Sequence, residues 1–224
     1  MAASDNNETQ SVATQGAPTA RTRMRRIAQR ADYDRATLHA ILDAAYVCHI
    51  AFADDLGVHC IPTACWREGD HLYIHGSNGS RMVKRLLESD ACVTITHLDG
   101  LVMARSAFSH SMNYRSAMIY GRFEMVGEDA AKRHALEHFM ETLAPGRQAE
   151  VRAGNDKEYA ATTVLRIGLA EAACKVRKGR PTDDEEDMSW PVWAGVVPFE
   201  RTRLAPIPDP DCALPVPQHI KNLY

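Results

Sequence analysis

Residues 71–84 run His71-Leu72-Tyr73-Ile74-His75-Gly76-Ser77-Asn78-Gly79-Ser80-Arg81-Met82-Val83-Lys84. The alternation up to His75 predicts a short strand, and the Gly/Ser turn ends it. Apolar residues then recur at helical spacing and predict a helix over 81–89. A strand, a tight turn and a helix follow one another here without a linker, which indicates a fold of short, closely joined elements.

The flanking segments extend this pattern. Before it we expect a helix over 34–47, capped by Asp34, and strands over 48–53 and 58–66. After it we expect strands over 91–97 and 101–105 around the turn Asp99-Gly100, a polar loop over 106–115, a strand over 116–126, a helix over 129–144 and strands over 162–167 and 171–176. Regular β-α-β alternation is absent. The sequence therefore predicts a mainly β fold, an antiparallel barrel with peripheral α-helices, and not a doubly wound parallel sheet.

Composition restricts the class of protein. The chain has 224 residues, with 26 Lys and Arg against 29 Asp and Glu and a net charge of −3. This near-neutral balance argues against a nucleic-acid-binding protein. No apolar run is long enough for a membrane span, and the polar first residues lack the apolar core of a secretory signal, so we expect a cytoplasmic protein without membrane contact.

The expected organisation is a disordered arm over 1–24, one barrel domain over 25–200 and an extended tail over 201–224. Five arginines gather near the start of the chain, at positions 21, 23, 25, 26 and 30. They fit either a solvated arm or an anion-binding segment. The six cysteines contain no CxxC pair, which predicts buried reduced thiols and no zinc ribbon.

The Gly/Ser turn is also the first candidate site. Backbone N–H groups at a helix start suit a phosphate, Ser77 and Ser80 add hydroxyls, and Arg81 and Lys84 add positive charge. Neither the Walker pattern nor GxGxxG is present. The alternative is a plain helix start with Ser80 as its N-cap.

Two further segments are rich in polar groups. Residues 105–116 could line a ligand or form a solvated loop. Lys175 and Arg177 share one face of the late strand, where they could meet a phosphate or form surface salt bridges. Trp190, Trp193 and Phe199 are expected to seal a core or a subunit contact.

One histidine motif is a poor candidate for zinc. His134-Ala135-Leu136-Glu137-His138 matches the HxxEH pattern, but both histidines lie opposite Leu136 on the expected helix and would point to solvent. No metal site is therefore predicted. His75, beside the Gly/Ser turn, is either a structural histidine or a functional one.

In this order, these pieces resemble the pyridoxamine 5′-phosphate oxidase-like flavoproteins, in the branch of flavin-nucleotide-binding proteins related to nitroimidazole-resistance proteins. The resemblance spans about residues 25 to 200. It is carried by segments 33–37, 61–63, 72–77, 99–108, 111–116, 175–177 and 193–198.

The resemblance implies an FMN-binding split β-barrel that forms a homodimer, with FMN in the groove between subunits. Ile61, Pro62, Thr63 and Ala64 would line the flavin ring. His75, Gly76, Ser77, Ser80, Arg81 and Lys84 would hold the ribityl chain and phosphate, with Lys175 and Arg177 as further phosphate contacts. Ser109, Ser111, Asn113, Tyr114, Arg115 and Trp193 would close the site. His75 matches the histidine implicated near the flavin in nitroimidazole-resistance relatives and is the candidate catalytic residue.

The expected function is an FMN-dependent oxidoreductase that passes electrons from a nicotinamide nucleotide to a small acceptor. The arginine and histidine pattern with which true pyridoxamine phosphate oxidases bind substrate is not recognisable, so vitamin B6 oxidation is not expected. The alternatives are a non-catalytic flavin-binding or storage protein and a split barrel that binds haem or a deazaflavin.

Overall fold

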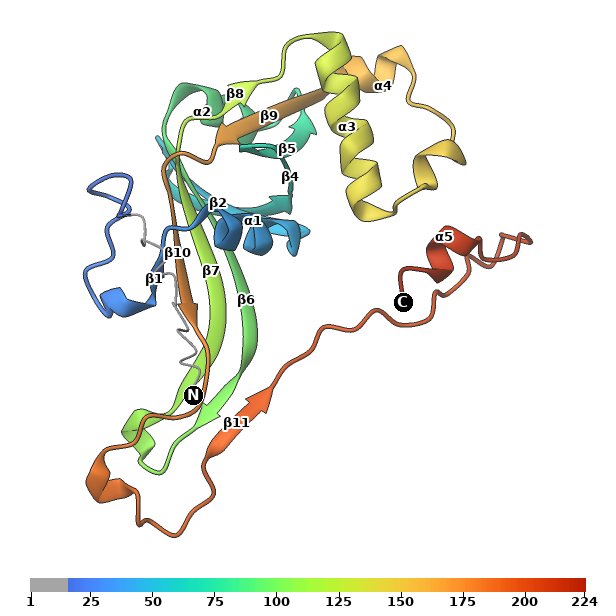
Figure 1. The fold of residues 1–224 in the computed structure, drawn as a ribbon. Helices are drawn as coiled ribbons and strands as arrows, with labels where there is room; N and C mark the ends of the chain where they lie inside the picture. The colour runs from blue at the N-terminus through green and yellow to red at the C-terminus, as the bar shows by residue number, and fades with distance from the viewer. Residues whose placement is uncertain (1–15) are drawn as a thin grey trace, which may run out of the picture.

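Residues 16–224 are described by a computed structural model, drawn as a ribbon in Figure 1. Strands dominate and form two antiparallel sheets with helices at the periphery. The predicted class, mainly β with peripheral α-helices, is confirmed. Most of the predicted arm over 1–24 lies outside the described residues. In its described part, Arg21 forms ion pairs with Asp90 and Glu171.

Sheet A is the larger sheet and sets the length of the molecule (Figure 1). Its strands follow the order β1-β10-β7-β6-β2-β3, and β11 pairs with the distal part of β6. Their bounds are β1 (Ala31–Asp32), β2 (Val47–Asp54), β3 (Gly57–Ala64), β6 (Ala91–Met103), β7 (Ser111–Gly121), β10 (Ala172–Arg177) and β11 (Gly195–Pro198). Within this order β3 is an edge strand that pairs only with β2.

Sheet B has the order β4-β5-β9-β8, from β4 (Trp66–Glu68), β5 (His71–Ser77), β8 (Glu124–Met125) and β9 (Thr162–Gly168). The single strand predicted over 58–66 is divided at Cys65. The amide of Cys65 bonds to the Tyr46 carbonyl, and Trp66 then pairs with Tyr73 in the other sheet. The main core lies between the sheets, because Ile50 of β2 and Ile74 of β5 belong to one buried cluster.

The helices pack around these sheets. They are α1 (Arg35–Asp43), α2 (Arg81–Glu88), α3 (Asp129–Leu143), α4 (Asp156–Ala161) and α5 (Gln218–Lys221), with 3-10 helices η1 (Ala28–Arg30), η2 (Ala107–Ser109), η3 (Arg147–Ala149) and η4 (Glu185–Asp187). Asp34 caps α1 as predicted, accepting from the Thr37 amide at 3.2 Å. α1 is shorter than predicted because Val47 already belongs to β2. α4 was not predicted.

The prediction of a hairpin turn at Asp99-Gly100 is wrong. β6 continues through it as one strand, and the pairing with β7 shifts between Leu98 and Gly100 because Asp99 is an extra residue, a β-bulge. The polar loop predicted over 106–115 is also too long, since β7 starts at Ser111. The connection between β6 and β7 is the short segment around η2.

The C-terminal part leaves the sheet and returns along the outside of the molecule (Figure 1). After β10 the chain passes through the acidic η4 to β11, and residues 199–224 then cross to the end of α3. There His219 Nδ1 lies 3.3 Å from Glu150. None of the described helices has both the length and the apolar surface to cross a bilayer.

The cysteines only partly follow the prediction of buried thiols. All six are free; Cys48, Cys65 and Cys174 are buried, whereas Cys60 and Cys212 are exposed.

Candidate functional site

The Gly/Ser turn forms the capped helix start that the sequence allowed. Ser80 is the N-cap of α2, and its hydroxyl accepts from the Val83 amide at 3.4 Å. This bond satisfies one of the four amides that a helix start leaves without an intrahelical partner. An added Cβ at Gly76 would lie 2.9 Å from a Val83 methyl, so a glycine lets the end of β5 approach the helix closely. The capped-helix geometry is therefore observed, and amides of the first helical turn other than that of Val83 are the ones an anion could contact.

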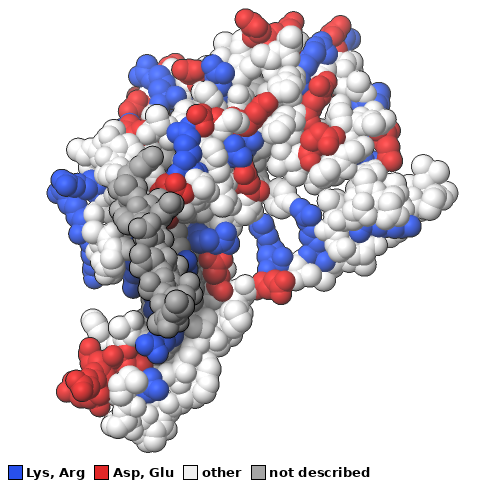
Figure 2. Space-filling view, viewed as in Figure 1, with Lys and Arg blue, Asp and Glu red and all other residues white. Residues whose placement is uncertain are grey.

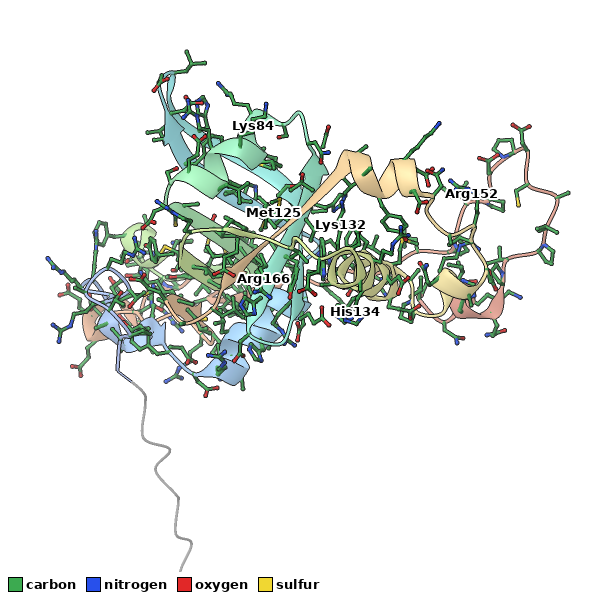
Figure 3. All side chains as sticks on the ribbon, turned by 90° about the horizontal axis from the view of Figure 1, so that it is seen from above. Lys84, Met125, Lys132, His134, Arg152 and Arg166 are labelled. Carbon is green, nitrogen blue, oxygen red and sulfur yellow. The ribbon has the colours of Figure 1, made fainter. Side chains whose placement is uncertain are left out.

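The two cations of this turn are exposed at the surface. The Arg81 guanidinium lies 3.3 Å from Asp54 at the β2–β3 turn, and about half of the Arg81 side chain is exposed. Asp54 also accepts from His59 Nε2 at 2.9 Å, and this bond holds the pKa of Asp54 below its usual value. Figure 3 shows Lys84 on the outer side of α2, directed away from the sheets. Lys84 thus points to solvent, and Arg81 is about half exposed although it is paired with Asp54, so both cations lie at the surface beside the β2–β3 turn.

The predicted ring-lining residues lie along the open edge of sheet A. Ile61 is half-buried against the core, whereas Pro62 is exposed. An edge strand presents backbone N–H and C=O groups without strand partners, which can hydrogen-bond a ligand. Since Asp54 places Arg81 near the Gly57 end of β3, the strand leads from the cationic turn towards Ala64.

A pocket of about 620 Å³ lies beside the Ala64 end of β3, and the sequence did not indicate it. It is lined by Tyr46, Glu200, Arg201, Thr202, Arg203, Leu223 and Tyr224. The guanidinium groups of Arg201 and Arg203 lie 5.5 and 5.8 Å from the centre of the Tyr46 ring. Figure 2 shows Lys and Arg side chains in the hollow between the body of the protein and the C-terminal segment. Its volume is in the range of small-molecule sites.

His75 lies on the other face of β5 from the main core. Its ring packs 5.1 Å from Phe139 of α3 and 5.9 Å from Trp66, while Leu72 and Ile74 face the core between the sheets, as the predicted alternation requires. Burial lowers the pKa of His75, so the ring is neutral at pH 7. Its buried Nδ1 has no hydrogen-bond partner within residues 16–224.

The remaining predicted site residues lie elsewhere, around the distal half of β6, β7 and β10. Arg115 forms a bidentate ion pair with Asp99, in which Nη2 and Nε donate to the two carboxylate oxygens at 2.8 and 2.9 Å. Lys175 pairs with Ser116 across the sheet and forms no ion pair within the described residues. The others in this region are Ser109, Ser111, Asn113, Tyr114, Arg177 and Trp193.

The predicted site residues therefore fall into two groups. Going from β10 to β3 along the sheet takes four steps, so at ~4.8 Å a step these two strands are roughly 19 Å apart along the curved surface. Asn113 and Arg177 are buried together, and Arg177 faces a pocket of its own with Arg30 and Arg180. In the sequence, Arg30 belongs to the group of arginines that fits either a solvated arm or an anion-binding segment, and no pattern connected it or Arg180 with Arg177. The recurrence of cations at 175–180 was the available signal.

The HxxEH motif does not form a metal centre. His134 is exposed as predicted and bonds to Glu68, but His138 is half-buried and contacts the Arg67 carbonyl, so only one of them points to solvent. Within residues 16–224, no three or more His, Cys, Asp or Glu side chains gather where they could hold a metal ion.

Comparison with known proteins identifies the class. A family model described as pyridoxamine 5′-phosphate oxidase matches residues 34–176, and this chain belongs to that family. Its fold is accordingly the split barrel of the pyridoxamine 5′-phosphate oxidase-like proteins. No curated protein sequence matches the chain.

Solved structures give more specific similarities. The flavocytochrome Anf3 from Azotobacter vinelandii is 42% identical, with 94% of this chain and 99% of that one covered and a TM-score of 0.90. The FAD and haem binding protein from Mycobacterium smegmatis is 37% identical over 87% of this chain and 97% of the other, with a TM-score of 0.83. A 5-nitroimidazole antibiotic resistance protein from Bacteroides thetaiotaomicron, 23% identical over 65% of this chain and 86% of that one, shares the fold with a TM-score of 0.56.

Proposed function

We propose that this chain binds a flavin, FMN or FAD, along β3 and transfers electrons from a nicotinamide nucleotide to a small acceptor. The observation that carries the proposal is the arrangement along β3: Arg81 and Lys84 lie at one end, an open strand edge follows, and the Tyr46 pocket lies at the other end. A flavin phosphate fits the first part and the isoalloxazine ring fits the strand edge. The names of two similar solved structures, a flavocytochrome and an FAD and haem binding protein, support this assignment.

Each residue group has a definite task in this arrangement. The amides at the start of α2 and the exposed Arg81 and Lys84 neutralise the phosphate. The free backbone groups of β3 hydrogen-bond the polar edge of the ring, and Ile61 supplies an apolar contact. Arg201 and Arg203 place positive charge near the Ala64 end, where it favours a reduced, negatively charged ring. A bound flavin supplies hydride and single-electron transfer.

Haem is a second candidate cofactor, and the chemistry of His75 fits it. A haem iron takes a neutral imidazole nitrogen, and His75 is neutral, flanked by aromatic rings and has an unpartnered ring nitrogen among the described residues. His75 would hold the iron, and the haem would supply one-electron transfer. The flavocytochrome and the FAD and haem binding protein favour this second function.

A homodimer is proposed from the separation of the two residue groups. Ser109, Tyr114 and Trp193 lie too far from β3 along sheet A to contact a flavin that is bound at β3 of the same chain. A second copy of the chain could supply these residues. Trp193 is 67% exposed and Phe108 is fully exposed, which is costly for a side chain that stays in water.

The test is flavin binding by a variant with one cation removed. Arg81→Ala should weaken FMN or FAD binding about tenfold, because one charge-assisted contact to the phosphate is lost. Titration of flavin fluorescence with protein freed of its cofactor measures this affinity. The control is Arg152→Ala, which removes an exposed arginine on the far side of α4 (Figure 3).

The purified protein itself gives the other readouts. Its absorbance spectrum shows flavin and haem separately, the mass of the released flavin distinguishes FMN from FAD, and bleaching by NADH or NADPH distinguishes an oxidoreductase from a storage protein. A colourless protein that gains no flavin spectrum, or an unchanged affinity in Arg81→Ala, would contradict the proposal.

A further inference from the structure

A second cationic pocket lies at the opposite edge of sheet A from Arg81. It has a volume of about 420 Å³ and lies between η1, β1, the end of β10 and the loop after it. Four of its nine lining residues are cationic and one is acidic: Gln29, Arg30, Ala31, Asp32, Val176, Arg177, Lys178, Arg180 and Thr182. The pocket thus concentrates positive charge in a protein whose net charge is slightly negative.

Arg177 is the central residue of this pocket. It is only 8% exposed, and its Nη1 donates to Asn113 Oδ1 at 2.5 Å. Its other bond, from Nη2 to the Arg180 carbonyl, is long at 3.4 Å, and the buried Nε has no partner within residues 16–224. All its acceptors are neutral, and it forms no ion pair within the described chain. A buried guanidinium is normally paired with a carboxylate or phosphate.

The surroundings make this positive charge less favourable, not more. Burial lowers the pKa of Arg177, and the nearby Arg30 lowers it further. Asn113 is itself buried and also donates to the Gly179 carbonyl, so it fixes both the guanidinium and the loop after β10. The fold therefore holds Arg177 in a defined orientation without supplying a counter-charge.

The acids nearby are committed to other contacts. Both Asp32 oxygens accept bonds, one from the Asp34 amide at 2.8 Å and one from the Thr37 hydroxyl at 2.9 Å. Asp183, the first residue of the acidic run, is buried and accepts from the amide and the guanidinium of Arg105. Figure 2 shows the rest of that run as an acidic cluster at the lower end of the molecule.

We propose that this pocket is a binding site for a phosphate-type dianion, either free phosphate or the phosphate of a nucleotide. Arginine is suited to this group because its planar N–H donors match two phosphate oxygens at once. The Arg177 guanidinium, whose buried Nε has no partner among the described residues, and the cations of Arg30, Lys178 and Arg180 supply the donors and the charge. The volume accommodates a phosphate together with part of its ester.

The experiment is isothermal titration of the whole chain, purified without phosphate, with inorganic phosphate and with ADP. We expect a saturable site whose affinity is weakened about tenfold or more in Arg177→Met and about threefold in Arg30→Gln. Arg30→Gln guards against misfolding, because no hydrogen bond of its side chain is present in the described chain. Lys132→Gln, on α3, is the charge-matched control and should bind normally (Figure 3).

The two ligands separate the two sources of phosphate. Tighter binding of ADP indicates a nucleotide, and equal or weaker binding of ADP indicates the free ion. The proposal is overturned if phosphate and ADP both fail to saturate the protein by about 10 mM, or if the two pocket variants bind like the original chain. Phosphate and ADP could also bind at the cationic turn beside β3, so Arg81→Ala separates the two sites: binding that is lost in Arg177→Met and kept in Arg81→Ala belongs to the Arg177 pocket.

Discussion

The imidazole ring of His75 is largely buried, and its Nδ1 has no hydrogen-bond partner among the described residues. Trp66 and Phe139 exclude water from it, and no carboxylate contacts it among the described residues, so protonation in the folded state is unfavourable. In the unfolded chain the same ring takes up a proton near its ordinary pKa of 6.5. This difference makes His75 a source of acid sensitivity as well as a candidate ligand.

The first prediction concerns the pH dependence of stability. As the pH falls below 6.5, the unfolded chain gains a proton at His75 before the folded chain does, so the free energy of unfolding should decrease. His75→Phe removes this proton uptake and should reduce the loss of stability between pH 7.5 and pH 5.5. Urea unfolding at the two pH values measures the difference for each protein.

His134 supplies a control of opposite sign. Its hydrogen bond to Glu68 raises the pKa of His134, so its contribution is present at low pH and is lost as the pH rises through that raised pKa. His134→Gln should therefore make the chain slightly more acid-sensitive. Equal pH dependence in His75→Phe and the original chain would show that the folded chain protonates His75 as readily as the unfolded chain does.

At the level of the elements, β6 shows how one extra residue redirects a strand. Ala91, Val93 and Ile95 are buried before the bulge, and Gly100 and Val102 are buried after it. Asp99 shifts the alternation by one residue, so the same face stays covered along the bent strand. The carbonyl of Asp99 also accepts from the Phe199 amide, just past the end of β11.

The second prediction is that Gly100→Ala loosens β11. An added Cβ would lie 2.7 Å from the Val197 carbonyl oxygen and 3.1 Å from the Pro198 Cα, and neither backbone atom can turn away. We expect a loss of about 1–3 kcal/mol in the free energy of unfolding and faster hydrogen exchange in β11. Gly168→Ala, where nothing lies within 4 Å, is the matched control. Unchanged exchange at Val196 and Val197 in Gly100→Ala would contradict this packing.

These elements show what local patterns can predict and where they stop. Some elements could be predicted because they depend only on neighbours in sequence. These are β5 with its alternation, the helix starts capped by Asp34 and Ser80, and α3 with its helical periodicity. The Asp99-Gly100 pair was misread because a turn dipeptide and a bulge differ only in what pairs across the sheet. The same limit applies to the site. Arg177 was predicted as a phosphate contact. Its hydrogen-bond partner Asn113 and the neighbouring Arg30 come close to it only through the register of β10 with β7 and with β1.

For the whole molecule, the distal end of sheet A exposes apolar side chains. Phe108 is fully exposed, and Trp190 and Trp193 are more than half exposed. Leu101 and Met112, on the paired strands β6 and β7, add to this surface. A surface of this kind is typical of a protein interface.

The third prediction is that this end holds two copies together. Phe108→Ser combined with Trp193→Ser should shift the chain from dimer to monomer, because aromatic side chains supply much of the binding energy of an interface. Sedimentation or light scattering measures the mass. Leu56→Ser, which changes a 78% exposed leucine in the β2–β3 turn, should leave the dimer intact. An original chain that is monomeric at working concentrations would exclude the homodimer.

The pairing of β5 with β9 has a consequence for synthesis on the ribosome. His71 pairs with Gly168 and Ser77 with Thr162, so sheet B cannot close until translation has passed residue 168. β10 then has to pair with both β7 and the early strand β1. Translation adds roughly 5–20 residues each second, so β5 and β7 wait several seconds for the strands that pair with their free edges. The nascent chain is therefore expected to depend on chaperones until its last strands emerge.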